Sequence, residues 1–211
     1  MRSGEPVTVL EILREARDVG ALGPGELEAQ VAHASAFVDA AGPELFDDAW
    51  LVDLGSGGGI PGLVIAARCP TLRVTLLDGR VQRAALLERA VDRLGWGERV
   101  SVLGERAEVA GRRAELRGRV DVVVARGFGR PAVTAECAAP LLRVGGRLVV
   151  SEPPGAVAAT SRWPAGPCGE LGLELVRLVE IQWSFAVLAQ VQLCPGRFPR
   201  RVGIPDKRPL F

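Results

Sequence analysis

The sequence is poor in lysine and histidine, and it has no long apolar run. Lys207 is the only lysine among the 26 basic residues, and we attribute this use of arginine to genomic compositional bias. The formal net charge of +1 creates no global field that would point to a nucleic acid. No stretch approaches the length of a membrane span, and residues 1–6 do not resemble the start of a signal peptide. These absences predict a cytoplasmic protein that does not contact a membrane.

The cysteines give no sign of a metal site. Cys69, Cys137, Cys168 and Cys194 are widely spaced, no pair has the C-x-x-C spacing, and His33 is the only histidine. Because zinc sites need clustered Cys and His ligands, we expect no metal. With 211 residues, of which 48% are hydrophobic, the chain can bury a core without disulfides. We therefore expect reduced, buried thiols.

Alternating apolar and amphipathic stretches from residue 49 onward predict an α/β domain. The apolar stretches end at turn residues, and the segments between them have helical spacing. The expected strands are 49–53, 72–77, 100–103, 120–125 and 147–151, and the expected helices are 61–68, 81–94, 108–116 and 132–142. Repeated β-α units of this length form a mostly parallel sheet with helices on both faces.

The segments on either side of these units have a different pattern. Apolar residues at helical spacing predict two helices, 6–17 and 26–41, before the first strand. After a break at 153–155 the pattern is weak, and then 173–183 and 185–193 are typical of an antiparallel strand pair. We therefore expect a helical cap (1–48), a cofactor-binding α/β domain (49–195) and a basic, proline-rich, irregular tail (196–211).

A glycine-rich turn, Asp53-Leu54-Gly55-Ser56-Gly57-Gly58-Gly59, follows the first expected strand of the α/β domain. Its Gly57-x-Gly59-x-x-Gly62 spacing matches the dinucleotide fingerprint, which alone is a weak signal. In a dinucleotide site a pyrophosphate lies at the helix N-terminus, and the Asp53 carboxylate would repel it. That carboxylate suits a cofactor with an ammonium and a sulfonium, such as S-adenosylmethionine, and the glycines allow a close approach to the backbone. The alternative is that Asp53 only caps the turn or the helix at Pro61.

A second acid supports a cofactor that contains a nucleoside. Asp78 ends the next expected strand, roughly twenty residues beyond the glycines, where a carboxylate can accept both ribose hydroxyls. This feature alone fits NAD equally well, and Asp53 is what favours S-adenosylmethionine. The alternative is that Asp78 only opens a turn with Gly79.

The extended turn resembles that of the RsmG, or GidB, methyltransferases, which methylate N7 of a guanine in small-subunit ribosomal RNA. In this turn the Ile60-Pro61-Gly62 continuation is far more specific than a generic glycine loop. Further similar segments follow in the family's order: Leu76-Leu77-Asp78 with Arg83, Arg106-Ala107-Glu108, Val122 to Arg126, and Phe198 to Leu210. The resemblance, from about Trp50 to the end, implies a Rossmann-like class I methyltransferase fold whose mostly parallel seven-stranded sheet ends in an antiparallel hairpin. It also implies S-adenosylmethionine as cofactor and ribosomal RNA, or the small ribosomal subunit, as partner.

The turn and the resemblance together give the expected cofactor-binding residues: Asp53, Gly55, Ser56, Gly57, Gly59, Ile60, Asp78, Ala107, Glu108 and Arg126. Ile60 would pack against the cofactor, and Ala107-Glu108 would lie beside the adenine. Arg126 would meet the cofactor carboxylate or an RNA phosphate through its planar fork, unless it pairs with an acid such as Glu136. No catalytic residue is assigned, because guanine N7 already holds an unshared pair and needs only alignment with the methyl group.

Two departures from the family leave the methyl acceptor open. The N-terminal helices lack the family's Asn-Leu-Thr and His-x-x-Asp-Ser-like segments, although His33 loosely resembles the histidine. Where the family has a lysine after its fifth strand, this chain has Ser151-Glu152-Pro153-Pro154. A divergent methyltransferase for a small molecule and a non-catalytic cofactor-binding protein therefore stand as alternatives to a ribosomal RNA methyltransferase.

Two further features each have two interpretations. Phe128 could stack on a base beside the cofactor methyl group, or it could belong to the core. The tail arginines could neutralise RNA phosphates. Alternatively, the prolines together with Phe198, Leu210 and Phe211 anchor the tail to the fold.

Overall fold

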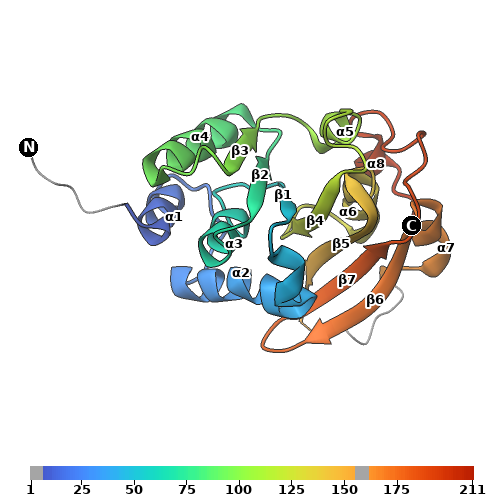
Figure 1. Ribbon diagram of the computed structural model, residues 1–211, viewed down its shortest axis with the longest axis horizontal. Coiled ribbons are helices and arrows are strands. Elements are labelled where there is room, and N and C mark those ends of the chain that lie inside the picture. Colours follow the sequence, from blue (N-terminus) through green and yellow to red (C-terminus); the bar gives the residue numbers. More distant parts are fainter. Residues whose placement is uncertain (1–6, 155–161) are drawn as a thin grey trace, which may run out of the picture.

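The computed structural model describes residues 7–154 and 162–211, which form a seven-stranded sheet with helices on both faces (Figure 1). The strands are β1 Trp50–Leu54, β2 Arg73–Leu77, β3 Val100–Leu103, β4 Val120–Ala125, β5 Leu142–Glu152, β6 Leu173–Glu180 and β7 Ser184–Gln190. Their order in the sheet is β3-β2-β1-β4-β5-β7-β6. Strands β1 to β5 are parallel, β7 is antiparallel to β5, and β6 is antiparallel to β7. The expected mostly parallel sheet with a C-terminal hairpin is confirmed.

Helices cover both faces of the sheet, which is why its central strands are apolar on both sides. The helices are α1 Val9–Asp18, α2 Leu27–Ala41, α3 Gly62–Arg68, α4 Val81–Leu94, α5 Ala107–Ala110, α6 Pro131–Ala138, α7 Ala165–Glu170 and α8 Ile204–Lys207, with a 3-10 turn, η1 Pro43–Phe46. Successive side chains of β4 face opposite clusters, since Val122 belongs to the apolar cluster that contains Phe37 of α2, while Val123 belongs to the cluster that contains Ala135 of α6. The N-terminal helices α1–α4 therefore cover one face, and the later helices cover the other (Figure 1).

The two N-terminal helices rest on the segment that follows the glycine turn. A capping box starts α1: Thr8 accepts from the Glu11 amide, and Glu11 accepts from the Thr8 amide. The buried Leu13 of α1 shares an apolar cluster with Ile60 and Val64, which come directly after the turn. The position of α1 and α2 is thus coupled to the position of the turn.

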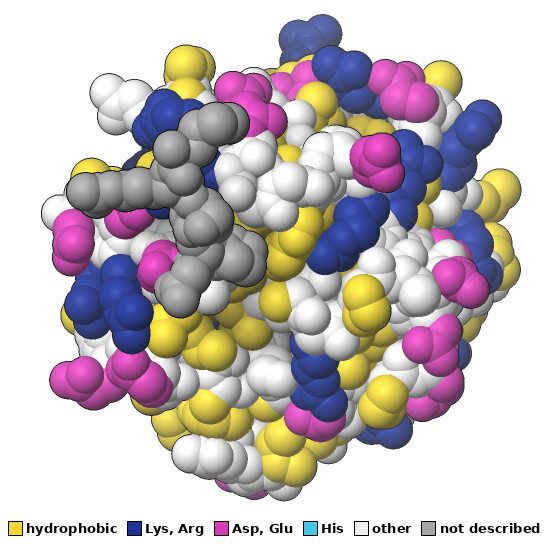
Figure 2. All heavy atoms as spheres, turned by 60° about the vertical axis from the view of Figure 1, so that its left-hand side comes forward, with side chains coloured by type: hydrophobic (Ala, Val, Ile, Leu, Met, Phe, Trp, Pro, Cys, Tyr) yellow, Lys and Arg dark blue, Asp and Glu magenta, His cyan; other side chains and the backbone are white. Residues whose placement is uncertain are grey.

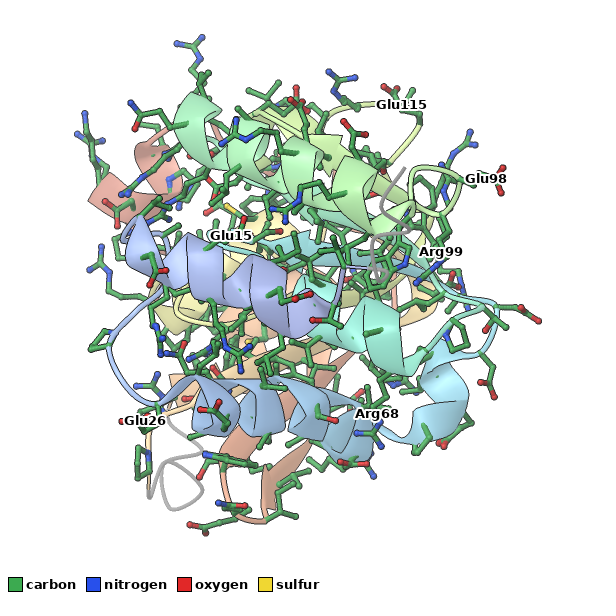
Figure 3. All side chains as sticks on the ribbon, turned by 90° about the vertical axis from the view of Figure 1, so that its left-hand side faces the viewer. Glu15, Glu26, Arg68, Glu98, Arg99 and Glu115 are labelled. Carbon is green, nitrogen blue, oxygen red and sulfur yellow. The ribbon has the colours of Figure 1, made fainter. Side chains whose placement is uncertain are left out.

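Ion pairs add to these apolar contacts on the outer surface. Figure 3 shows α1 lying between α4 and α2. Arg93 of α4 pairs with Glu15 of α1, and Arg68 of α3 pairs with Asp39 of α2 at 2.5 Å. Both pairs are exposed, so we expect them to contribute little to stability compared with the apolar contacts.

Basic and acidic side chains are interspersed on the face of the molecule drawn in Figure 2. This agrees with the formal net charge of +1. In the described ranges, none of the helices is both long enough and apolar enough to cross a bilayer.

Three expected element boundaries were wrong. The helix expected at 108–116 is only α5, Ala107–Ala110, and after it the amides of Arg112 and Arg113 donate to the carbonyls three residues back, as in a series of turns. The helix expected at 132–142 ends at Ala138, and β5 begins at Leu142, five residues before the strand start expected at 147. The cause is a bulge in the β4–β5 pairing, where Leu142 pairs with Val120 but Arg147 pairs with Val122, with Gly145 and Gly146 in between.

The tail packs back onto the fold. Phe198 is buried, and the Arg117 guanidinium donates hydrogen bonds to the carbonyls of Cys194, Pro195 and Phe198 at 2.8–3.0 Å. The fully buried Glu136 of α6 accepts three hydrogen bonds from the Arg200 guanidinium, at 2.6–3.1 Å. The expectation of an irregular tail was wrong at α8, a single turn that packs on α6.

Loss of the Arg200 side chain should destabilise the protein. The Arg200→Ala variant leaves the buried Glu136 carboxylate with only the Arg200 amide as a donor, and a stranded buried charge is costly. We expect the free energy of unfolding, measured in urea, to fall by about 2–4 kcal/mol. The matched control is Arg201→Ala, an exposed neighbour, which should change it by less than about 0.5 kcal/mol. Equal effects of the two substitutions would contradict this account of the tail.

Candidate functional site

The glycine turn lies at the carboxyl edge of the parallel strands, between β1 and α3. The amides of Gly55 and Ser56 both donate to the Leu77 carbonyl at the end of β2, at 2.8 and 3.0 Å. The turn therefore bends toward β2 rather than toward β4. A side chain at Gly62 would be impossible without movement, because a Cβ there would lie 2.4 Å from Leu76 and 2.6 Å from the Asp53 carboxylate.

Asp53 lies behind the turn and is fully buried. Its Oδ2 accepts a hydrogen bond from the Gly62 amide at 3.0 Å, while Oδ1 has no partner within the described part of the chain. Burial raises the pKa of this carboxyl to about 7, against the opposing effect of the Gly62 hydrogen bond. The carboxylate thus ties the end of β1 to the start of α3, as in the capping alternative considered from the sequence.

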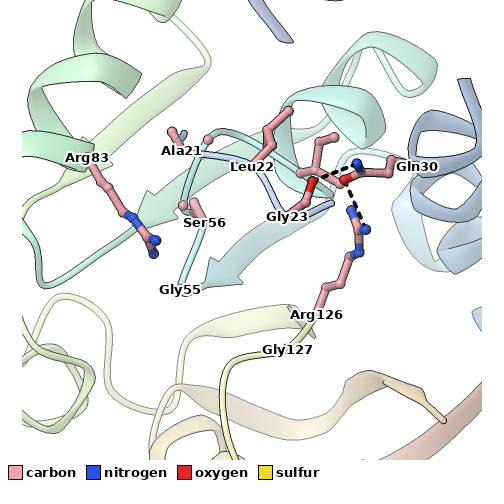
Figure 4. Close-up of a pocket in the computed structure, with 12 residues that line it drawn as sticks. Ala21, Leu22, Gly23, Gln30, Gly55, Ser56, Arg83, Arg126 and Gly127 are labelled. Carbon is pink, nitrogen blue, oxygen red and sulfur yellow. Dashed lines mark hydrogen bonds between the residues drawn. The ribbon is translucent and has the colours of Figure 1, made fainter. Parts of the chain in front are cut away.

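A first cavity, of about 290 Å³, opens in front of the turn (Figure 4). The turn forms one wall through Gly55, Ser56, Gly57, Gly58 and Ile60. The loop between α1 and α2 forms another wall, with Leu22 so close to Gly58 that an added Cβ would lie 2.6 Å from it. Arg83, Gln30 and Arg126 complete the lining. The cavity is therefore polar and carries positive charge.

Gln30 connects the two sides of the first cavity, as Figure 4 shows. Its amide nitrogen donates to the carbonyls of Gly23 and Gly25 at 3.1 and 3.3 Å, and its oxygen accepts from the Arg126 guanidinium at 3.1 Å. The alternative partner for Arg126, Glu136, instead binds Arg200. Burial lowers the pKa of Arg126. Among the described residues no carboxylate pairs with this half-buried cation, so it can receive an anion.

The buried Asp78 carboxylate is connected to residues of both the first cavity and a second one. Its side chain accepts hydrogen bonds from the amides of Gly57 and Arg80, both at 2.9 Å, and the Arg83 guanidinium is 3.8 Å away. Asp78 itself lines neither cavity, but its hydrogen-bond partner Gly57 lines the first and its chain neighbour Gly79 lines the second. Each carboxylate oxygen has capacity for one more hydrogen bond, which leaves room for a ligand hydroxyl.

The second cavity, of about 300 Å³, is lined by residues from four separate segments: Gly79, Arg106, Ala107, Glu108, Phe128, Gly129, Val133 and Asp206. Phe128 also packs on the core cluster and on Gly55, where an added Cβ would lie 2.7 Å from its ring. Both interpretations of Phe128 are thus consistent with its position. The apolar part of this lining, Ala107, Phe128 and Val133, suits a flat aromatic ligand.

The Glu108 carboxylate belongs to the attachment of the tail. It is buried and accepts from the Gly203 amide at 2.8 Å and from Arg106 at 3.3 Å. Burial alone would raise the pKa of Glu108, but these hydrogen bonds outweigh it and the pKa is lowered. The tail therefore borders the second cavity both through Glu108 and directly through Asp206.

Sequence reasoning missed three parts of this site: the loop 21–23, Gln30 and Asp206. The available signal was Gln30, a polar residue on the same helical face as Leu27, Ala34 and Phe37, all of which are buried. Asp206 and the loop gave no such signal, because their proximity to the site arises only from tertiary packing.

Two features in which this chain differs from the family pattern, Glu152 and His33, line neither cavity. The Glu152 carboxylate is occupied by Trp163 Nε1 at 2.7 Å and Arg162 Nε at 2.6 Å. His33 packs among the rings of Phe37, Trp183 and Phe185, and burial lowers its pKa to about 4. The segment 155–161, including Gly155 of the proline break, lies outside the described residues.

The cysteines are free thiols, and only Cys137 and Cys168 are buried, whereas Cys69 and Cys194 are partly exposed. The expectation that all the thiols are buried was wrong for those two. In the regions that the structure describes, no three His, Cys, Asp or Glu side chains cluster closely enough to hold a metal ion.

Comparisons with known proteins agree with this geometry. Residues 36–152 match the family GidB, described as rRNA small subunit methyltransferase G. Two relatives are both named ribosomal RNA small subunit methyltransferase G: one from Rubrobacter xylanophilus is 34% identical over 170 residues, and one from Chloroflexus aggregans is 38% identical over 165 residues. Each alignment covers 76% of this chain, but only 64% of the Rubrobacter protein and 69% of the Chloroflexus protein.

Solved structures show the same fold. A geranyl diphosphate C-methyltransferase from Streptomyces coelicolor, solved with S-adenosyl-L-homocysteine, superposes with a TM-score of 0.60 at 14% identity and covers 90% of each chain. An O-methyltransferase from Agrobacterium tumefaciens, titled as predicted, superposes with a TM-score of 0.55 at 23% identity, covering 74% of this chain and 79% of its own. The class I methyltransferase fold is confirmed.

The raised pKa of Asp53 predicts a pH dependence of stability. Because the folded chain holds this proton more tightly than the unfolded chain, the stabilising effect is lost as pH rises from about 4 to about 7. Relative to Asp53→Asn, measured without ligand, the free energy of unfolding of the natural protein should decline over that range, by at most about 1.4 kcal/mol per pH unit. Parallel pH profiles of the two proteins in urea denaturation would show that Asp53 titrates normally.

Proposed function

The chain belongs to the GidB family of rRNA small subunit methyltransferase G proteins, and on this premise we propose that it transfers a methyl group from S-adenosylmethionine to N7 of a guanine in small-subunit ribosomal RNA. The observation that supports this proposal most strongly is a pair of cavities on either side of the glycine turn's contact with Asp78: Gly57, whose amide binds Asp78, lines the first, and Gly79, the residue after Asp78, lines the second. Such a substrate would place the activity with ribosomes in the cytoplasm.

The residues present fit the methionine end of the cofactor in the first cavity. Arg126 offers a guanidinium fork for the cofactor carboxylate, and a half-buried cation gains from an anionic partner. The turn residues Gly55, Ser56 and Gly57 would present backbone to the ligand and Ile60 would pack at its side, whereas the expected Gly59 does not line the cavity and Gly58 does. Asp53 acts from behind by holding the turn in shape.

The nucleoside end of the cofactor fits Asp78 and the second cavity. Asp78 would accept the ribose hydroxyls with the lone pairs left over from Gly57 and Arg80. The adenine would lie against Ala107 and Phe128, and Glu108 would act through the backbone while its carboxylate holds the tail.

Methyl transfer to N7 requires no proton acceptor from the protein. When bound, the cofactor supplies a methyl carbon on a positively charged sulfur. Transfer forms the N7–carbon bond as the carbon–sulfur bond breaks, and no proton leaves the guanine. The tasks of this chain's residues are to bind, to align and to exclude water, which agrees with a site that contains no acid–base pair.

Glu152 was the main reason to consider a small-molecule acceptor. Its carboxylate lines neither cavity and is bound by Trp163 and by the Arg162 guanidinium, which offsets its negative charge. The ribosomal RNA acceptor is therefore the function that the site supports best.

The proposal can be tested with purified protein, tritiated S-adenosylmethionine and 30S particles that lack the modification. Label should appear in N7-methylguanine. Arg126→Ala should raise the dissociation constant of the cofactor at least tenfold in calorimetry. A change of about this size is expected when one charge-assisted hydrogen bond is lost. The control Arg119→Ala removes an exposed arginine at the opposite edge of the sheet and should leave binding unchanged.

The two measurements separate the parts of the proposal. Absence of cofactor binding by the natural protein would refute the whole site assignment. Cofactor binding without transfer to RNA would refute the acceptor and leave the cofactor site standing.

A further inference from the structure

A groove lined by arginines continues from the first cavity along α4. Its volume is about 390 Å³, and its charged lining is Arg80, Arg83 and Arg89, facing Val19 to Ala21 at the end of α1. Ala21 and Arg83 also line the first cavity, so the two spaces share a wall. We propose that this groove binds the phosphate backbone of the RNA strand beside the nucleotide that is methylated. This inference rests on the proposed RNA substrate.

The arginines of the groove are available for a ligand. In the residues that the structure describes, Arg80 and Arg89 have no carboxylate within 4.0 Å and donate no side-chain hydrogen bond. Arg83 has only a distant contact with Asp78, at 3.8 Å. A guanidinium fork matches the oxygens of a phosphate, and several forks along one groove match the repeated charges of a nucleic acid strand.

Apolar side chains along the same groove fit the rest of a nucleotide. Val19 lines the groove and is 69% exposed, and Leu86, which also lines it, is partly buried. A valine this exposed is surrounded by water in the free protein, and it can pack against a sugar or a base when a strand lies on the arginines. A surface that has both cations and apolar side chains can bind the phosphates of a strand and also pack against its sugars.

The basic tail is the other surface that could bind RNA, but some of its arginines already pair with carboxylates of this chain. Arg200 is bound to the buried Glu136, and Arg197 pairs with Glu170 at 3.5 Å. Arg112 and Arg117, beside the tail, donate to its carbonyls. Arg201, Lys207 and Arg208 stay exposed, but they line neither the groove nor the first cavity. What distinguishes the groove from the tail is that its unpaired cations adjoin the first cavity, which is the proposed methyl-transfer site.

The test is direct binding of a short single-stranded RNA, followed by fluorescence anisotropy across a salt series. Arg80→Gln and Arg89→Gln should each weaken binding, by about tenfold at low salt, and each should lower the slope of log K against log salt by about 0.7. The matched control Arg119→Gln removes an exposed arginine at the opposite edge of the sheet and should change neither quantity. Cofactor affinity should be unchanged in all these variants, because their side chains lie outside the first cavity.

Three outcomes decide the proposal. Loss of affinity and slope only in the groove variants supports it. Loss in Arg201→Gln and Lys207→Gln with no loss in the groove variants would assign the backbone contact to the tail and overturn it. If all variants bind RNA as the natural protein does, the groove has no such role. Because RNA binding is measured without methyl transfer, this result stands apart from a failure of the proposed activity.

Discussion

The hydrogen bond between the Gly62 amide and the buried Asp53 carboxylate joins the end of β1 to the start of α3, and the turn between them depends on it. With both ends fixed, the turn has to bend toward β2, where Leu77 accepts from Gly55 and Ser56. This bend brings Gly57 against Asp78, and Gly57 lines the first cavity while Gly79, the residue after Asp78, lines the second. The proposed cofactor site therefore depends on this buried contact.

The walls of the cavities come from the two ends of the chain. The α1–α2 loop covers the turn and is held by Gln30, while the tail borders the second cavity through Asp206 and the Gly203–Glu108 hydrogen bond. Both walls are attached by specific polar contacts to the rigid sheet. We therefore expect ligand affinity to depend on how firmly these two segments are attached to the sheet. If either segment were detached in the free protein, ordering it upon binding would cost free energy.

The sequence allowed the central sheet, the turn and the positions of Asp78 and Arg126 to be predicted, since strand ends in a parallel sheet share one edge. It did not reveal the contact of Gln30 with Arg126, because residues so distant in sequence meet only through the packing of α2 on the sheet. Glu136 was a reasonable partner for Arg126 by proximity in sequence. The helix instead turns it toward Arg200 of the tail, whose course no local pattern determines.

The net charge does not predict where this protein can bind an anion, because its arginines have different roles. Some bind carbonyls, as Arg177 does at the end of α2, and some neutralise buried carboxylates, as Arg200 does. These cations act inside the fold and contribute little to the field outside it. The cations that can attract an anionic partner are those without an internal partner. Arg80 and Arg89 have none among the described residues, and they lie together beside the cavity proposed for methyl transfer. A nearly neutral protein can therefore recognise a nucleic acid through a local excess of unpaired charge.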